Sequence, residues 1–153
     1  GIAQDEGARC LLGGGTPKAP GLAQGWFVEP TIFADVTNAM RIAREEVFGP
    51  VLSIIPFEDE AHAVEIANDT IYGLAAGVWT GSTRRAFLMA DRLQAGTVWV
   101  NTYRAVSFMA PFGGYKRSGI GRESGQDAIY EYLQTKTVWM NLAEGVPNPF
   151  VLR

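Results

Sequence analysis

The chain has 153 residues, of which 47% are hydrophobic and 11% aromatic, enough for one globular domain with a core. Its net charge of −3 and pI near 5.1 provide no general attraction to nucleic acid or to an anionic membrane surface. No apolar run approaches the ~20 residues that a membrane span requires, so we expect neither a nucleic-acid nor a membrane partner. The single cysteine, Cys10, excludes an internal disulfide framework and favours a reducing compartment, which predicts a cytoplasmic protein.

The first residues resemble the end of a helix. Residues 1–8 contain no initiator methionine, signal-peptide core or helix-capping residue, so we expect a piece of a longer protein. A short strand is predicted at residues 9–12. An extended segment is predicted at residues 26–33, where Pro30 implies an edge or a bulge.

A regular alternation of elements follows. The predicted order is a strand at 51–57, a helix at 59–68, a strand at 75–80, a helix capped by Ser82 or Thr83, and a strand at 97–101. The first of these strands is apolar on both faces except for Ser53, which predicts a sheet covered on both sides. Short connections between alternating strands and helices are typical of βαβ crossovers. We therefore predict an α/β fold with a parallel sheet, half of a doubly wound domain.

The C-terminal third is less regular. Residues 103–123 are rich in glycine and have no hydrophobic period, and a long ordered loop of this kind is usually either functional or a mistaken assignment. Ser124 is predicted to cap a helix with Asp127 in its first turn. The segment from Lys136 to Leu142 alternates apolar and other residues, which predicts an edge strand that docks onto another subunit of a homo-oligomer. We accordingly divide the chain into residues 1–134 and an oligomerisation strand and tail at 135–153.

The stretch E-E-V-F-G-P-V at residues 45–51 combines acids, a ring and a Gly-Pro break ahead of a strand. The Gly49-Pro50 pair should end any helical turn and direct the chain into the strand. A carboxylate at Glu46 can accept two hydrogen bonds from a vicinal diol, and the ring of Phe48 can cover a flat heterocycle. The alternative interpretation is a solvated, acid-rich helix end.

Three blocks, taken in order, resemble the NAD(P)-dependent aldehyde dehydrogenases. The first is E-E-V-F-G-P-V at 45–51, and the second is Y-G-L-A-A-G-V at 72–78. The third is G-T-V-W-V-N at 96–101, followed by P-F-G-G-Y-K at 111–116, S-G at 118–119, G at 121 and R-E at 122–123. The resemblance covers nearly the entire chain, to about Leu142, and corresponds to the C-terminal third of such an enzyme. It implies part of the catalytic-domain sheet followed by an oligomerisation strand.

The resemblance also implies residue roles. Glu46 would accept hydrogen bonds from the nicotinamide-ribose hydroxyls of NAD or NADP, and Phe48 would pack beside the nicotinamide ring. Phe112 and Val106 would line the tunnel for an aldehyde substrate. Arg104 lies in the variable substrate loop, where it would either clamp an acidic substrate or face solvent.

Other residues near this implied site are expected to have structural roles. Asn101 would end its strand facing the catalytic cleft as a hydrogen-bonding residue. Gly113 and Gly114 would permit positive φ and close backbone approach, as would residues 119–121.

Three family segments do not occur in the 153 residues: the nucleophile's G-Q-x-C, the general base's E-L-G-G-K and the nucleotide-binding G-S-T-x-x-G. Cys10 lies in a piece that resembles a surface strand. We therefore expect the chain to supply part of a nicotinamide pocket and a substrate wall but to be inactive alone. Two alternatives stay open: a stand-alone oligomerisation module, and a relative that transfers the acyl group to phosphate or coenzyme A. Which aldehyde is used, NAD versus NADP, and dimer versus tetramer are also open.

Overall fold

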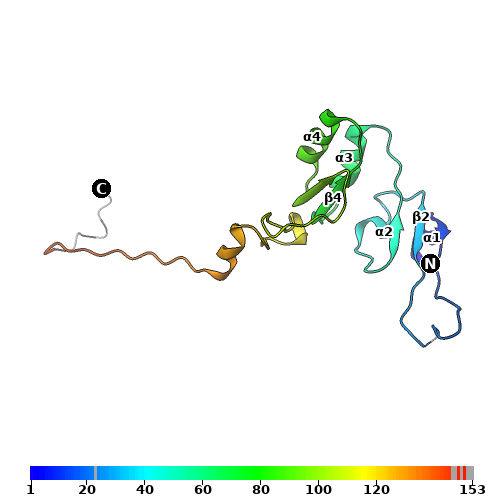
Figure 1. Ribbon diagram of the computed structural model, residues 1–153, viewed down its shortest axis with the longest axis horizontal. Helices are drawn as coiled ribbons and strands as arrows, with labels where there is room; N and C mark the ends of the chain where they lie inside the picture. Colours follow the sequence, from blue (N-terminus) through cyan, green and yellow to red (C-terminus); the bar gives the residue numbers. More distant parts are fainter. Residues whose placement is uncertain (23, 146–147, 149, 151–153) are drawn as a thin grey trace.

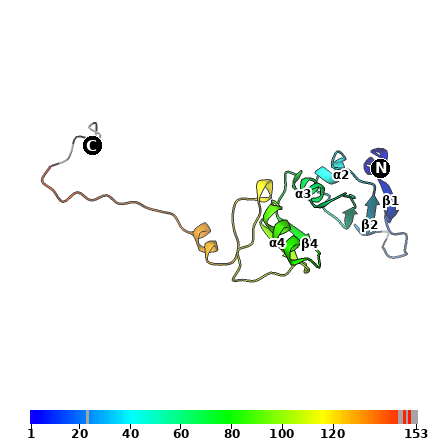
Figure 2. The same ribbon diagram turned by 90° about the horizontal axis from the view of Figure 1, so that it is seen from above.

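The computed structural model describes residues 1–22, 24–145, 148 and 150. Figure 1 shows two small α/β units along the long axis, followed by a C-terminal segment that runs away from both; Figure 2 shows the same arrangement from above. Among the described residues, no helix combines the length and apolar character needed to cross a membrane.

The first unit is a three-stranded sheet with two short helices. Its elements are α1 (Ile2–Asp5), β1 (Arg9–Leu12), β2 (Thr31–Ala34), α2 (Arg41–Arg44) and β3 (Val51–Ser53). The strand order is β1-β2-β3, with β1 antiparallel to β2 and β3 parallel to it. A small core of Ala3, Ala8, Phe33 and Val36 joins α1 to this sheet.

The second unit consists of α3 (Glu60–Asn68), β4 (Ala75–Val78), α4 (Thr83–Arg92) and β5 (Thr97–Val100). β4 and β5 pair in parallel, with α4 against them and α3 against α4. Both helices begin at a side-chain cap: Asp59 accepts a hydrogen bond from His62 N (2.9 Å), and Ser82 accepts one from Arg85 N (3.3 Å). The predicted βαβ crossover is therefore present in β4-α4-β5.

The other predicted crossover differs from the structure. The strand expected at 51–57 spans only Val51–Ser53 and pairs with β2, not with β4, so α3 connects two different sheets. Beyond Ser53, Ile54 N donates to Phe33 O (2.8 Å) and Ile54 O accepts from Val36 N (3.3 Å), and Pro56 has no N–H with which to extend the ladder further. The sheet is also not covered on both sides within this chain, because Leu52 is 56% exposed.

The C-terminal elements are two 3₁₀ helices, η1 (Lys116–Ser118) and η2 (Asp127–Tyr132). The expected cap at Ser124 is wrong: η2 begins after Gln126, and Ser124 adopts a positive φ of 62°. A strand from Lys136 to Leu142 is also absent from the described chain, where this segment runs away from the two units (Figure 1) and all of its residues are exposed. An edge strand needs a neighbour for its backbone groups, and this segment has none here. Residues 146, 147, 149 and 151–153 of the predicted tail lie outside the described residues.

Candidate functional site

The E-E-V-F-G-P-V stretch connects α2 to β3. α2 ends at Arg44, and Glu45 is already extended (φ −100°, ψ 147°). A tight turn closes with Gly49 N donating to Val47 O (2.8 Å), and Thr31 N then donates to Pro50 O (2.8 Å) where β3 begins. The stretch therefore leaves a helix and enters a parallel strand, with Glu46, Val47 and Phe48 at the point of exit.

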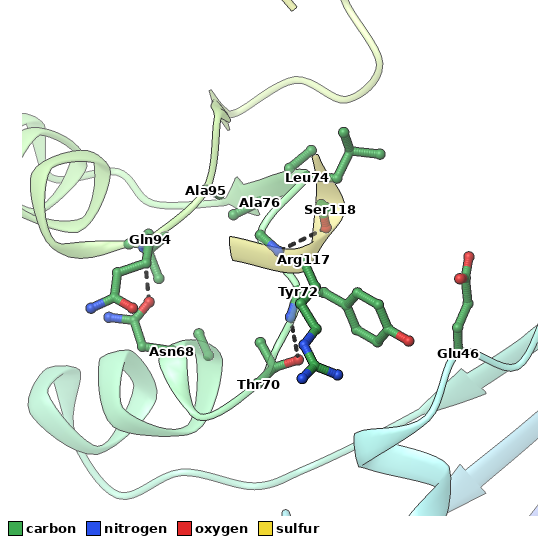
Figure 3. Close-up of a pocket in the computed structure, with 14 residues that line it drawn as sticks. Glu46, Asn68, Thr70, Tyr72, Leu74, Ala76, Gln94, Ala95, Arg117 and Ser118 are labelled. Atoms are coloured by element: carbon green, nitrogen blue, oxygen red, sulfur yellow. Dashed lines mark hydrogen bonds between the residues drawn. The ribbon is translucent and has the colours of Figure 1, made fainter. Parts of the chain in front are cut away.

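Glu46 is exposed and lines a cavity of about 540 Å³ between the two units. Figure 3 shows its carboxylate on one side of this cavity, with the Tyr72 ring and the Arg117 side chain on the other. Among the described residues, none forms an ion pair or hydrogen bond with this carboxylate. An available carboxylate at a cavity fits the adjacent hydroxyls of a ribose.

Phe48 is 96% exposed, so both faces of its ring are available to a flat partner, which fits a heterocycle. Phe48 is not among the residues that line the Glu46 cavity. The two side chains therefore share one short segment but do not form a joint wall in this chain alone.

Arg44, the last residue of α2, holds the start of the connection from α2 to β3. Its guanidinium binds the Asp69 carboxylate in a bidentate manner, Nη1 to Oδ1 at 2.8 Å and Nη2 to Oδ2 at 2.7 Å. Arg44 Nε also donates to Asn38 O, and Asn38 Nδ2 donates to Asp69 Oδ2 (3.2 Å). These donors, Arg44 first, hold the pKa of Asp69 below its ordinary value of 3.8. Sequence reasoning missed this pair, since nothing local links two residues 25 positions apart.

The glycine-rich loop is ordered because it docks onto residues 68–73. The backbone contributes bonds from Tyr115 N to Gly73 O (2.8 Å) and from Arg117 N to Ile71 O (2.9 Å). Side chains contribute bonds from Gly73 N to Ser118 Oγ (3.0 Å) and from Lys116 Nζ to Asn68 O (2.7 Å) and Thr70 O (3.1 Å). The Y-G-L and P-F-G-G-Y-K blocks, far apart in sequence, therefore form one surface.

Phe112 and its glycines occupy a tightly packed turn. Phe112 and Glu123 exchange two backbone hydrogen bonds, each 2.7 Å. A Cβ on Gly113 would lie 2.3 Å from Gly121 O, and one on Gly114 would lie 2.6 Å from Ser118 Cβ. Close approach of the backbone therefore requires glycine at both positions. The prediction of a positive φ is wrong for Gly113 and Gly114, whereas Gly119 has a positive φ of 127°.

Asn101 ties together the carboxyl ends of β4 and β5. Its Oδ1 accepts from Thr80 N (2.8 Å) and its Nδ2 donates to Thr80 O (2.9 Å). Its φ of 53° lies in the left-handed region, which asparagine tolerates better than most residues. These contacts are structural, and a place for Asn101 at a catalytic cleft stays a prediction.

The substrate-loop residues are not brought together. Val106 is 77% exposed, Arg104 is exposed with a φ of 56°, and neither lines the cavity of about 600 Å³ to which Phe112 contributes. The loop is fixed by a bond from Trp99 Nε1 to Ala105 O (2.7 Å). Their roles in a substrate tunnel, like that of Phe112, stay predictions.

Comparison with known proteins places these residues in context. The model of the aldehyde dehydrogenase family matches residues 1–138. The chain is 50% identical over 145 residues to a betaine aldehyde dehydrogenase of Brucella melitensis, covering 95% of this chain and 30% of that protein.

Two solved structures are similar to this one. The betaine aldehyde dehydrogenase of Staphylococcus aureus in complex with NAD⁺ is 43% identical with a TM-score of 0.89, covering 98% of this chain and 30% of that one. A mutant indole-3-acetaldehyde dehydrogenase of P. syringae in complex with NAD⁺ and IAA is 48% identical with a TM-score of 0.84, covering 92% and 28%. The chain thus spans less than a third of the length of these relatives. Because the family model covers most of its residues, the chain belongs to the aldehyde dehydrogenase family.

Proposed function

We propose that this chain forms the C-terminal part of an NAD(P)-dependent aldehyde dehydrogenase that oxidises an aldehyde to a carboxylic acid. In that enzyme it would supply contacts to the nicotinamide ribose and part of the substrate-tunnel wall. The observation that carries the proposal is the Glu46 carboxylate, which faces a cavity from the family's E-E-x-F-G-P-V motif. The NAD⁺ complexes of the S. aureus and P. syringae relatives support a cofactor of this type.

In this proposal, residues of the chain bind and orient the cofactor and the aldehyde. When bound, the nicotinamide accepts the hydride that leaves the substrate carbon. Glu46 would hold the adjacent ribose by two charge-assisted hydrogen bonds, and Phe48 would cover one face of the ring. Phe112 and Val106 would line the aldehyde tunnel, and Arg104 would contact an acidic substrate or face solvent. Such positioning lowers the barrier by fixing the reacting groups in a productive geometry.

Two neighbouring glutamates allow a matched test. In the protein that carries this sequence, Glu46→Gln should raise the Kd for NAD⁺ about tenfold, because a neutral amide keeps one acceptor and loses the charge. Glu45→Gln is the control, since Glu45 is already paired with Arg41 (2.8 Å) and should leave the Kd unchanged. Calorimetric titration with NAD⁺ measures both. Equal effects of the two variants, or none from Glu46→Gln, would refute the assignment.

We also propose that the segment from Lys136 to Leu142 joins subunits of a homo-oligomer. Val138, Met140 and Leu142, at alternate positions, are 72%, 77% and 88% exposed, and exposed apolar side chains gathered in this way are typical of an interface. An extended segment can add as a strand to a neighbouring sheet edge. Light scattering should show a lower mass for Met140→Asp than for the unmodified protein. An unchanged mass would contradict this role. The cytoplasmic location stays a prediction.

A further inference from the structure

The segment that carries Glu46 is fixed only at its ends. Within the described chain, residues 46–48 form no hydrogen bond to another element; the one bond they make is the local turn from Gly49 N to Val47 O. On the β3 side the anchor is Pro50 O, which accepts from Thr31 N (2.8 Å). On the α2 side Glu45 is bonded within its own turn, with Glu45 N donating to Arg41 O (2.8 Å), and Arg44 ties that turn to Asp69. The position of the Glu46 carboxylate relative to residues 68–73 therefore depends on what holds Arg44.

Arg44 is held more firmly than its exposure suggests. Besides both carboxylate oxygens of Asp69, it donates to the backbone carbonyls of Asn38 and Asp69 (Nη1 to Asp69 O, 3.2 Å). The side chains of Arg44 and Asp69 are 44% and 47% exposed, where a single-point ion pair contributes little. A planar guanidinium bonded to two carboxylate oxygens and two carbonyls fixes both distance and orientation.

Asp69 in turn belongs to the segment on which the glycine-rich loop docks. The residues on either side of it, Asn68 and Thr70, accept from Lys116 Nζ through their carbonyls. Further along, Gly73 bonds Tyr115 and Ser118. The Arg44–Asp69 pair, with Asn38 bonded to both residues, is thus a polar link between the Glu46 segment and the surface that continues to Phe112.

We propose that Arg44 and Asp69 are positioning residues, which act through Glu46 by fixing the exit of α2 relative to residues 68–73. The inference rests on the proposed role of Glu46 toward the nicotinamide ribose. If the link is cut, Glu46 remains chemically intact but samples positions outside the productive one, so cofactor affinity falls without loss of the fold.

Asp69→Asn is the sharpest perturbation. Asp69 Oδ1 and Oδ2 both accept from Arg44, so replacing either oxygen by an amide nitrogen removes one leg of the bidentate contact. In the protein that carries this sequence, we expect the Kd for NAD⁺ to rise about three- to tenfold. Arg44→Lys should have a similar effect, because an ammonium cannot reproduce the fork.

A matched control lies between α3 and α4. Glu60 pairs with Arg85, and this arginine–carboxylate pair is also partly exposed but lies away from Glu46. Glu60→Gln should shift Tm about as much as Asp69→Asn while leaving the Kd for NAD⁺ unchanged. Far-UV circular dichroism and thermal unfolding report the fold independently of any activity.

The decisive comparison is with Glu46→Gln. If Arg44 and Asp69 act through Glu46, adding Asp69→Asn to Glu46→Gln should raise the Kd less than twofold further, because contacts already lost cannot be lost again. The inference would be overturned if the double variant raised the Kd by the product of the two single-variant factors. It would also be overturned if the Kd of Asp69→Asn were like that of Glu60→Gln. If Asp69→Asn does not fold, the same criteria apply to Arg44→Lys. Failure of the proposed function is distinct: Glu46→Gln alone would then leave the Kd unchanged.

Discussion

Gly96 offers a stringent test of how the G-T-V-W-V-N stretch at 96–101 packs against the P-F-G-G-Y-K stretch at 111–116. It precedes β5, and a Cβ at this position would lie 1.7 Å from Gly113 O, half the 3.4 Å at which ordinary contact begins. Its neighbours are backbone atoms, so the clash cannot be relieved by turning a side chain. Moving residues 113–114 away would strain the two bonds that share Gly73 O, from Gly96 N (3.0 Å) and Tyr115 N (2.8 Å). Overpacking and weakened hydrogen bonds together predict a loss of about 2–4 kcal/mol for Gly96→Ala.

Urea unfolding of the protein that carries this sequence, followed by circular dichroism, measures that loss. Gly81→Ala is the matched control, because a Cβ there meets nothing within 4 Å and its φ is not positive. It should change the free energy of unfolding by less than about 1 kcal/mol, in the stabilising direction. A Gly96→Ala variant as stable as the Gly81→Ala variant would refute the packing described here.

Three further outcomes follow from the contacts. Asn101→Ala should lower the free energy of unfolding by about 1–3 kcal/mol, because it removes both bonds to Thr80 and places alanine at a φ of 53°; urea unfolding at wild-type midpoint would contradict this. Phe48→Ala should stay within about 0.5 kcal/mol of wild type, since the ring is 96% exposed, and a large loss would show that the ring is structural. Because Arg44 lowers the pKa of Asp69, that carboxylate adds stability that is complete above its ordinary pKa of 3.8 and is lost as pH falls through the lowered folded value. Acid titration should therefore destabilise the wild type more steeply than Asp69→Asn below about pH 4, and parallel curves would exclude this linkage.

The elements that could be predicted from sequence are those that local chemistry determines. α3 and α4 begin where a capping side chain, Asp59 or Ser82, precedes an apolar period, and cap and helix lie within a few residues of each other. β4, α4 and β5 follow one another with short connections and pair as a parallel unit. The three motif blocks were sufficient to indicate the family that the comparison then confirmed.

What could not be predicted depends on long-range partners. Periodicity indicated a strand at Val51 but not that it pairs with Thr31 instead of Ala75. The docking of residues 111–118 onto 68–73 relies on hydrogen bonds to backbone groups and on glycine contacts, which leave no hydrophobic period in the sequence. The bidentate pair of Arg44 and Asp69 joins residues 25 positions apart. The alternation from Lys136 to Leu142 predicted a strand, but among the described residues this segment pairs with no other strand.

The central claim is that the Glu46 segment receives the nicotinamide end of the cofactor, and a crystal structure of the protein that carries this sequence, with NAD⁺ bound, tests it most directly. The account predicts Glu46 carboxylate oxygens about 2.5–3.0 Å from both hydroxyls of the nicotinamide ribose. It also predicts the Phe48 ring in contact with the nicotinamide. A bound cofactor whose ribose hydroxyls are met by other residues, with Glu46 turned to solvent, would contradict it.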